Sequence, residues 1–178
     1  MKKQNNLINL AFSAMFLALA LLLPFITGQV PQIGNMLCPM HIPVILCGFI
    51  CGAPWGFLTG FISPLLRSMI FGVPVMFPNA LSMAFELASY GLICGMLYRT
   101  FPKKKIYIYF SLLISMFAGR LIWGLVQFAC MGFNSSKFGF AAFFAGAVTN
   151  AVPGIILQII IIPIIVILLN KTKLVKTQ

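Results

Sequence analysis

Acidic side chains are almost absent from this sequence. Of its 178 residues only Glu86 is acidic, and only His41 is a histidine. One carboxylate and one histidine leave no second partner for acid–base catalysis, for a metal site or for an ion-coupled transport cycle. The motifs Gly-x-Ser-x-Gly and His-Glu-x-x-His and a phosphate-cradling glycine loop are absent as well. We therefore expect no enzyme activity, no cofactor, no bound metal and no built-in ATPase.

Charged residues of either sign are scarce. They make up 7% of the chain, whereas hydrophobic residues make up 61%. A soluble domain of this size cannot hide so much apolar surface, so lipid must be the solvent for most of the chain. The length allows about six spans of roughly 20 residues each. We expect one all-α integral membrane domain over residues 1–178.

Six apolar segments predict six membrane-spanning helices, at about 7–25, 41–53, 55–71, 80–98, 106–131 and 143–169. With six spans, both termini lie on the same side as the loop at 99–105, and that side carries nine of the twelve basic residues. Arg67 and Arg120 fall within spans, and Lys137 lies in a loop on the opposite side. Because cytoplasmic loops are rich in Lys and Arg, we expect a multi-pass protein of the cell membrane with both termini cytoplasmic.

Neither the high positive charge nor the cysteines change the expectation of a membrane protein. The formal net charge of +11 comes mainly from basic flanks of membrane helices, not from a basic face interleaved with aromatic residues, so no nucleic-acid partner is expected. The five cysteines show no disulfide framework or metal-site spacing, and most lie in apolar segments, where a thiol behaves as a small hydrophobe.

Small residues recur at helical spacing in two places. Gly48, Gly52, Gly56 and Gly60 follow one another every four residues, which favours close packing of the second and third segments as a hairpin. In the first segment, Ala14 and Ala18 form an Ala-x-x-x-Ala step. This step suits either internal packing or a flat face for another membrane protein, and composition does not separate the two.

Three ionisable residues, Arg67, Glu86 and Arg120, lie within apolar segments. A charge near mid-bilayer costs several kcal/mol, so such residues usually face a protein interior or a water-filled cavity. One interpretation is a structural ion pair between Glu86 and one of the arginines. The other is a net-positive cavity, open to the outside, in which an arginine binds a carboxylate or phosphate of a ligand.

Other polar residues near these segments could complete such a cavity. His41 lies at the mouth of the second segment, and Asn79 either lines the cavity or caps the fourth helix. Trp123 and Gln127 follow Arg120 at one-turn steps and could hold an aromatic or aliphatic ligand. The sixth segment contributes Asn150 and Gln158.

The chain resembles the substrate-binding S components of energy-coupling factor (ECF) vitamin transporters. The resemblance rests on its length, six spans with both ends inside, a long ordered loop after the first helix, the Ala14-x-x-x-Ala18 step and the segment PMHIPVILCGFICGAPWGFLTGFISPLL. It implies a high-affinity binding subunit for a vitamin or related micronutrient, held near the external face. It also implies partners, a membrane-embedded coupling (T) subunit contacted by Ala14 and Ala18 and two ATPase subunits.

Two arginines against one glutamate favour an anionic or acceptor-rich substrate, and pantothenate is our first candidate. A pyridoxine-type or riboflavin-like vitamin also fits, whereas cationic thiamine and metal ions such as nickel or cobalt fit less well. The alternative is a stand-alone six-helix membrane protein, such as a small channel or an assembly factor, whose buried charges form a structural ion pair.

Overall fold

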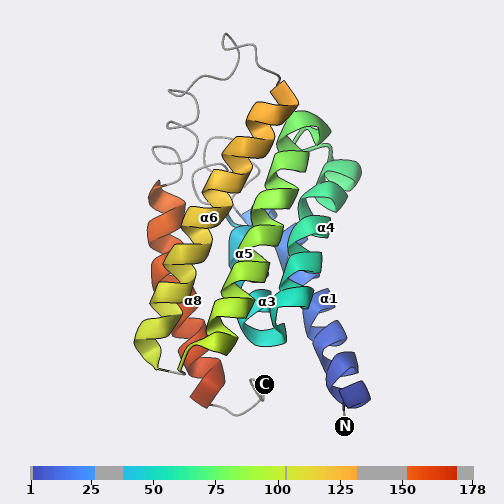
Figure 1. The fold of residues 1–178 in the computed structure, drawn as a ribbon. Coiled ribbons are helices and arrows are strands. Elements are labelled where there is room, and N and C mark those ends of the chain that lie inside the picture. Colours follow the sequence, from blue (N-terminus) through green and yellow to red (C-terminus); the bar gives the residue numbers. More distant parts are fainter. Residues whose placement is uncertain (1, 27–37, 103, 132–151, 172–178) are drawn as a thin grey trace.

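In the computed structural model, the described part of the chain comprises residues 2–26, 38–102, 104–131 and 152–171. Within it all regular structure is helical, as the sequence predicts (Figure 1). The elements are α1 (Lys2–Ile26), α3 (His41–Cys51), α4 (Ala53–Phe71), a short π-helix η1 (Met76–Ala80), α5 (Leu81–Thr100), α6 (Lys105–Met131) and α8 (Val152–Lys171). Residues 143–151 of the predicted sixth span, including Asn150, lie outside the described residues.

Six α-helices are present in the described residues, but their lengths differ. Four are long and apolar enough to cross a membrane, over Asn6–Phe25, Met76–Thr100, Lys105–Met131 and Val152–Leu169. Helix α3 has only 11 residues, and the 19 residues of α4 include Arg67 among other polar positions. The two helices form the tight hairpin that the sequence predicts, with the turn at Gly52. Six complete spans therefore remain a prediction.

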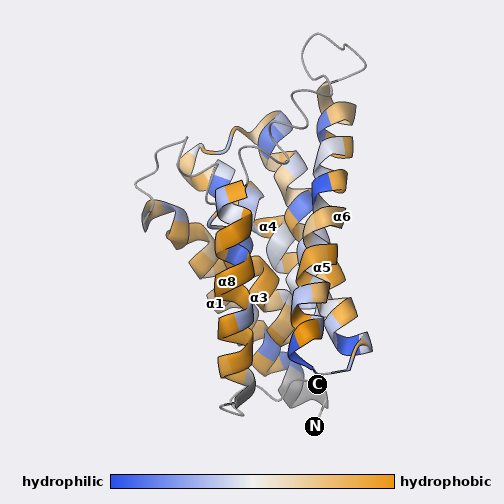
Figure 2. Ribbon diagram, turned by 90° about the vertical axis from the view of Figure 1, so that its left-hand side faces the viewer, coloured by the Kyte–Doolittle hydropathy of each residue, from blue (hydrophilic) through white to orange (hydrophobic). Residues whose placement is uncertain are grey.

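Several helix ends and connections lie together at the same end of the bundle. The start of α1, the end of α8, the turn between α3 and α4 and the connection from α5 to α6 all lie at one end of the bundle (Figure 1). Arg99, Lys104 and Lys105 are exposed at this end. Figure 2 shows hydrophobic residues along most of α1, α3 and α8. This is the arrangement expected of a membrane bundle with its basic residues at one end.

Backbone contacts between glycines bring α3, α4 and α5 together. A Cβ atom on Gly48 of α3 would lie 2.6 Å from the carbonyl oxygen of Gly91 on α5. A Cβ on Gly56 of α4 would lie 2.7 Å from Cα of Gly48. A Cβ on Gly91 would collide with the backbone of Gly56. The predicted glycine packing of the hairpin is confirmed, and Gly91 adds a third helix to it.

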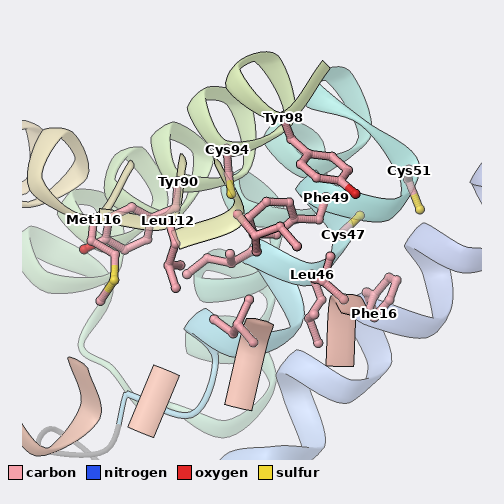
Figure 3. Close-up of a cluster of buried hydrophobic side chains, with 14 residues drawn as sticks. Phe16, Leu46, Cys47, Phe49, Cys51, Tyr90, Cys94, Tyr98, Leu112 and Met116 are labelled. Carbon is pink, nitrogen blue, oxygen red and sulfur yellow. The ribbon is translucent and has the colours of Figure 1, made fainter. Parts of the chain in front are cut away.

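The main apolar core lies between α3, α5, α6 and α8, and α1 adds Phe16 to it. Figure 3 shows part of it, with Leu46 and Phe49 from α3, Tyr90 from α5 and Met116 from α6. Helix α8 contributes Ile162 and Val166 to the same cluster. Because Tyr90 belongs to this core and carries a hydroxyl group, it joins the core to the polar residues described next.

The glycine packing predicts a strong effect of one added methyl group. Gly91→Ala should lower the free energy of unfolding by about 1–3 kcal/mol, because the new Cβ overlaps the Gly56 backbone, which cannot move away without separating the helices. Thermal unfolding of the purified protein in detergent measures this. Gly72→Ala is the control, since nothing lies within 4 Å of its Cβ position and only its φ of +71° opposes the change. Equal losses in both variants would contradict the packing argument.

Candidate functional site

The single carboxylate lies at the centre of a buried polar cluster. Glu86 of α5 is 1% exposed. Its Oε1 lies 3.0 Å from Nη1 of Arg120 on α6, and it accepts a hydrogen bond of 2.8 Å from the hydroxyl group of Tyr90. Nε2 of His41, at the start of α3, lies 3.6 Å from the same oxygen. Three helices thus converge on one carboxylate.

Helical spacing explains how these side chains meet. Tyr90 follows Glu86 by four residues, so both lie on the same face of α5. Gly119, next to Arg120, leaves space for the Tyr90 ring, because a Cβ atom there would overlap that ring. The rings of His41 and Tyr90 then pack at a centroid distance of 5.3 Å. A small residue on α6 therefore allows α5 to bring its tyrosine against the ion pair.

A second set of hydrogen-bonded polar side chains lies further along the interface between α5 and α6. Ser82 precedes Glu86 by one turn, and its Oγ lies 2.7 Å from Oε1 of Gln127. Nε2 of Gln127 donates to Oδ1 of Asn79 at 3.3 Å. The alternative that Asn79 caps the fourth helix is wrong, because α5 begins after Ala80 with no side-chain cap. The amide of Asn79 pairs with Gln127 instead.

Some buried polar atoms in the cluster around Glu86 have no hydrogen-bond partner among the described residues. Among the described residues, Nδ1 and Nε2 of His41 and Nε of Arg120 have no hydrogen-bond partner, and neither does Oε1 of Gln158 on α8. A buried polar group without a partner costs about 1–3 kcal/mol. Such groups concentrate where a bound molecule or ordered water completes the hydrogen bonding. The cluster around the ion pair is therefore the candidate site in the described part of the chain.

Arg67 does not join this cluster. Its Nη1 donates to the carbonyl oxygen of Leu21 on α1 at 2.9 Å. Its guanidinium lies 5.3 Å from the ring centroid of Phe25 and 5.6 Å from that of Phe71. Leu21 and Phe25 belong to the last turns of α1, where the helix dipole favours a cation. Arg67 thus attaches the end of α1 to α4, and it is Arg120 that pairs with Glu86.

Two of the predicted site residues, Trp123 and Asn150, have not yet been placed relative to the Glu86 cluster. Trp123 is half-buried on α6, one turn from Arg120, and Asn150 lies outside the described residues. Sequence reasoning missed three members of the site: Tyr90, Ser82 and Cys38, whose Sγ lies 3.7 Å from Nη2 of Arg120. One-turn spacing from Glu86 was a usable signal for Tyr90 and Ser82, whereas nothing in the sequence linked Cys38 to Arg120.

Comparison with protein-family models decides the class. Residues 9–166 match the model of the ECF transporter, substrate-specific component. The chain belongs to this family. No match to the chain was found among curated proteins or among solved structures.

As an ECF S component, the chain is a membrane-embedded substrate-binding subunit of a transporter and not an enzyme. S components work with a membrane T subunit and ATPases. Ala14 and Ala18, the residues expected to face such a partner, are both exposed on α1. Of the four candidate spans, α1 is the one with the smallest buried share.

The ion pair predicts a rescue by double substitution. Arg120→Met should lower the free energy of unfolding by about 3–5 kcal/mol, because it leaves the Glu86 carboxylate buried without its cation. Adding Glu86→Gln should recover most of the lost free energy of unfolding, since neither member of the pair then carries a charge. Thermal unfolding of the two variants measures the difference. A double variant no more stable than Arg120→Met would show that the pair is not the dominant interaction.

Arg67 should affect α1 rather than the cluster. Arg67→Leu should remove about 1.5–3 kcal/mol of local stability, because a charged donor no longer bonds the Leu21 carbonyl. Hydrogen–deuterium exchange should speed up in the last turns of α1 and stay unchanged around Glu86. The control is Arg120→Leu, which should have the opposite pattern. Faster exchange around Glu86 in Arg67→Leu would contradict the separation of the two arginines.

Proposed function

We propose that this S component is the high-affinity binding subunit for a vitamin or a related micronutrient. Transport is then driven by a T subunit and two ATPase subunits. The observation that carries the proposal is the cluster around Glu86, in which Nδ1 of His41 on α3 and Nε of Arg120 on α6 are buried beside the ion pair with no hydrogen-bond partner among the described residues. A purely structural ion pair has no need of additional unpaired polar atoms.

The membrane topology belongs to the same proposal. Both termini are cytoplasmic, and the chain crosses the cell membrane several times. Supporting this, Arg99, Lys104 and Lys105 lie at the end of the bundle that also holds the start of α1 and the end of α8 (Figure 1). Glu86 and Arg120 lie about 21 and 23 Å from that end, counted along α5 and α6 at 1.5 Å per residue. With this topology, the depth supports a site in the outer half of the membrane.

The exposed face of α1 is the proposed contact for the T subunit. Ala14 and Ala18 are one turn apart and both exposed, whereas Ser13, Phe16 and Ala20 face the bundle. Small side chains allow another helix to approach closely in lipid.

The alternative of a stand-alone membrane protein has one observation in its favour. The Glu86–Arg120 pair exists, and it could serve only to hold α5 and α6 together. The two functions differ in what stays bound to the purified protein. A binding subunit retains a small molecule and its partners, whereas a channel or an assembly factor retains no ATPase.

Gentle purification from its own membranes tests the proposal. Native mass spectrometry should find the chain with a T subunit, two ATPase subunits and a bound small molecule. Ala14→Leu combined with Ala18→Leu should lose the subunits and keep the small molecule, because both changes lie on the exposed face of α1. Met15→Leu, also exposed on α1, is the control and should keep both. Preparations of the unaltered protein with neither subunits nor small molecule would favour the stand-alone alternative.

A further inference from the structure

Four buried polar atoms of the bundle have no hydrogen-bond partner among the described residues, although one of them, Nε2 of His41, lies 3.6 Å from Oε1 of Glu86. They are both ring nitrogens of His41, Nε of Arg120 and Oε1 of Gln158. His41 is 2% exposed and Gln158 is 1% exposed, so these groups are shielded from the surroundings of the bundle. Because folding seldom leaves several buried polar atoms unpaired in one place, they indicate the hydrogen-bonding pattern of a missing partner.

Gln158 lies at a depth similar to that of the ion pair. It is 13 residues before the last residue of α8, while Glu86 is 14 before the last of α5 and Arg120 is 15 after the first of α6. These helix ends lie at the same end of the bundle (Figure 1). At 1.5 Å per residue, all three positions are about 20 to 23 Å along their helices from that end.

The face of α8 that carries Gln158 is turned toward the other helices. Ile155 and Ile162, about one turn to either side of Gln158, pack in the apolar cluster that contains Tyr90 and Met116. Tyr90 in turn donates its hydroxyl hydrogen bond to Glu86. Gln158 therefore belongs to the same interior as the Glu86 cluster, on the side formed by α8.

The charges of this interior are already balanced. The Glu86 carboxylate is matched by Arg120 at 3.0 Å. Arg67 bonds the α1 backbone and is not available as a second cation. A negatively charged ligand group would therefore be buried without a counter-ion, which is costly in a water-poor interior. Counting two arginines against one glutamate overstates the positive charge of the site.

We propose that the substrate carries no charge at pH 7 and that the part of it that enters this site is amide-like, as in a lactam or an amide-bearing heterocycle. Nε of Arg120 donates to the carbonyl oxygen of this group, Oε1 of Gln158 accepts a hydrogen bond from its N–H, and Nδ1 of His41 completes the contacts. The tilted rings of His41 and Tyr90 add an aromatic wall suited to a planar molecule. This inference rests on the proposed function and names the substrate class for the same site.

The test uses substrates sorted by charge. A vitamin-rich nutrient extract is separated by ion exchange at pH 7 into anionic, cationic and uncharged fractions. Each fraction is added to the full-length, ligand-free protein in detergent, and the Tm is measured, since a bound ligand stabilises the folded state. We expect the uncharged fraction to raise the Tm and the two charged fractions to leave it unchanged.

The other results separate the two proposals. An equal or larger rise with a charged fraction would overturn the uncharged substrate class and leave the binding function intact. No rise with any fraction would overturn the binding function, and the substrate class with it.

Two variants test the role of Gln158 itself. Gln158→Leu should need about tenfold more of the uncharged fraction for a half-maximal Tm rise, because one buried hydrogen bond to the ligand is lost. The Tm of each variant without ligand is its own baseline, because only Oε1 of Gln158 is known to have no hydrogen-bond partner. Ser111→Ala is the matched control. It also removes a buried, unpaired oxygen, but nine residues or roughly 14 Å along α6 from Arg120. Equal shifts in both variants, or none in Gln158→Leu, would overturn the role of Gln158.

Discussion

The rest of the bundle depends on one interaction, the pairing of the buried Glu86 carboxylate with Arg120. A lone carboxylate in a lipid-embedded bundle is tolerated only when a cation and hydrogen-bond donors satisfy it. Arg120 supplies the cation and Tyr90 a hydroxyl donor, so α5 and α6 have to pack in one register. The same register brings Gln127 to Ser82 further along the interface. One ionised group therefore specifies the alignment of two long helices that are otherwise mostly apolar.

Close backbone packing makes this arrangement possible on the other side of α5. Gly48, Gly56 and Gly91 let three backbones touch, so α5 is held against the short hairpin of α3 and α4. His41, the first residue of α3, reaches the carboxylate because the hairpin packs so closely on α5. Larger residues at the glycine positions would move His41 away from Glu86. Because these glycines carry no Cβ atom, α3 and α4 pack closely enough on α5 for His41 to reach Glu86.

The two buried arginines illustrate how similar sequence contexts can have different roles. Each is flanked by apolar residues, and each could have been the partner of Glu86. Arg67 bonds the Leu21 carbonyl between two phenylalanine rings, whereas Arg120 pairs with the carboxylate. The charge of the site is therefore close to neutral, and the site differs from the net-positive cavity that the composition suggests.

The sequence by itself determined the membrane class, the helical fold, the approximate helix bounds and the family resemblance. These follow from hydrophobic runs, from the placement of lysines and arginines and from glycine spacing, all of which are local properties of the chain. It also indicated His41, Glu86 and Arg120 as neighbours in function, because ionisable residues are rare at membrane depth. Only the tertiary structure decided which arginine pairs with Glu86, that Asn79 bonds Gln127 and that Gln158 is buried inside the bundle. Those outcomes depend on how far each helix is rotated and shifted against its neighbours, which spacing along one helix does not encode.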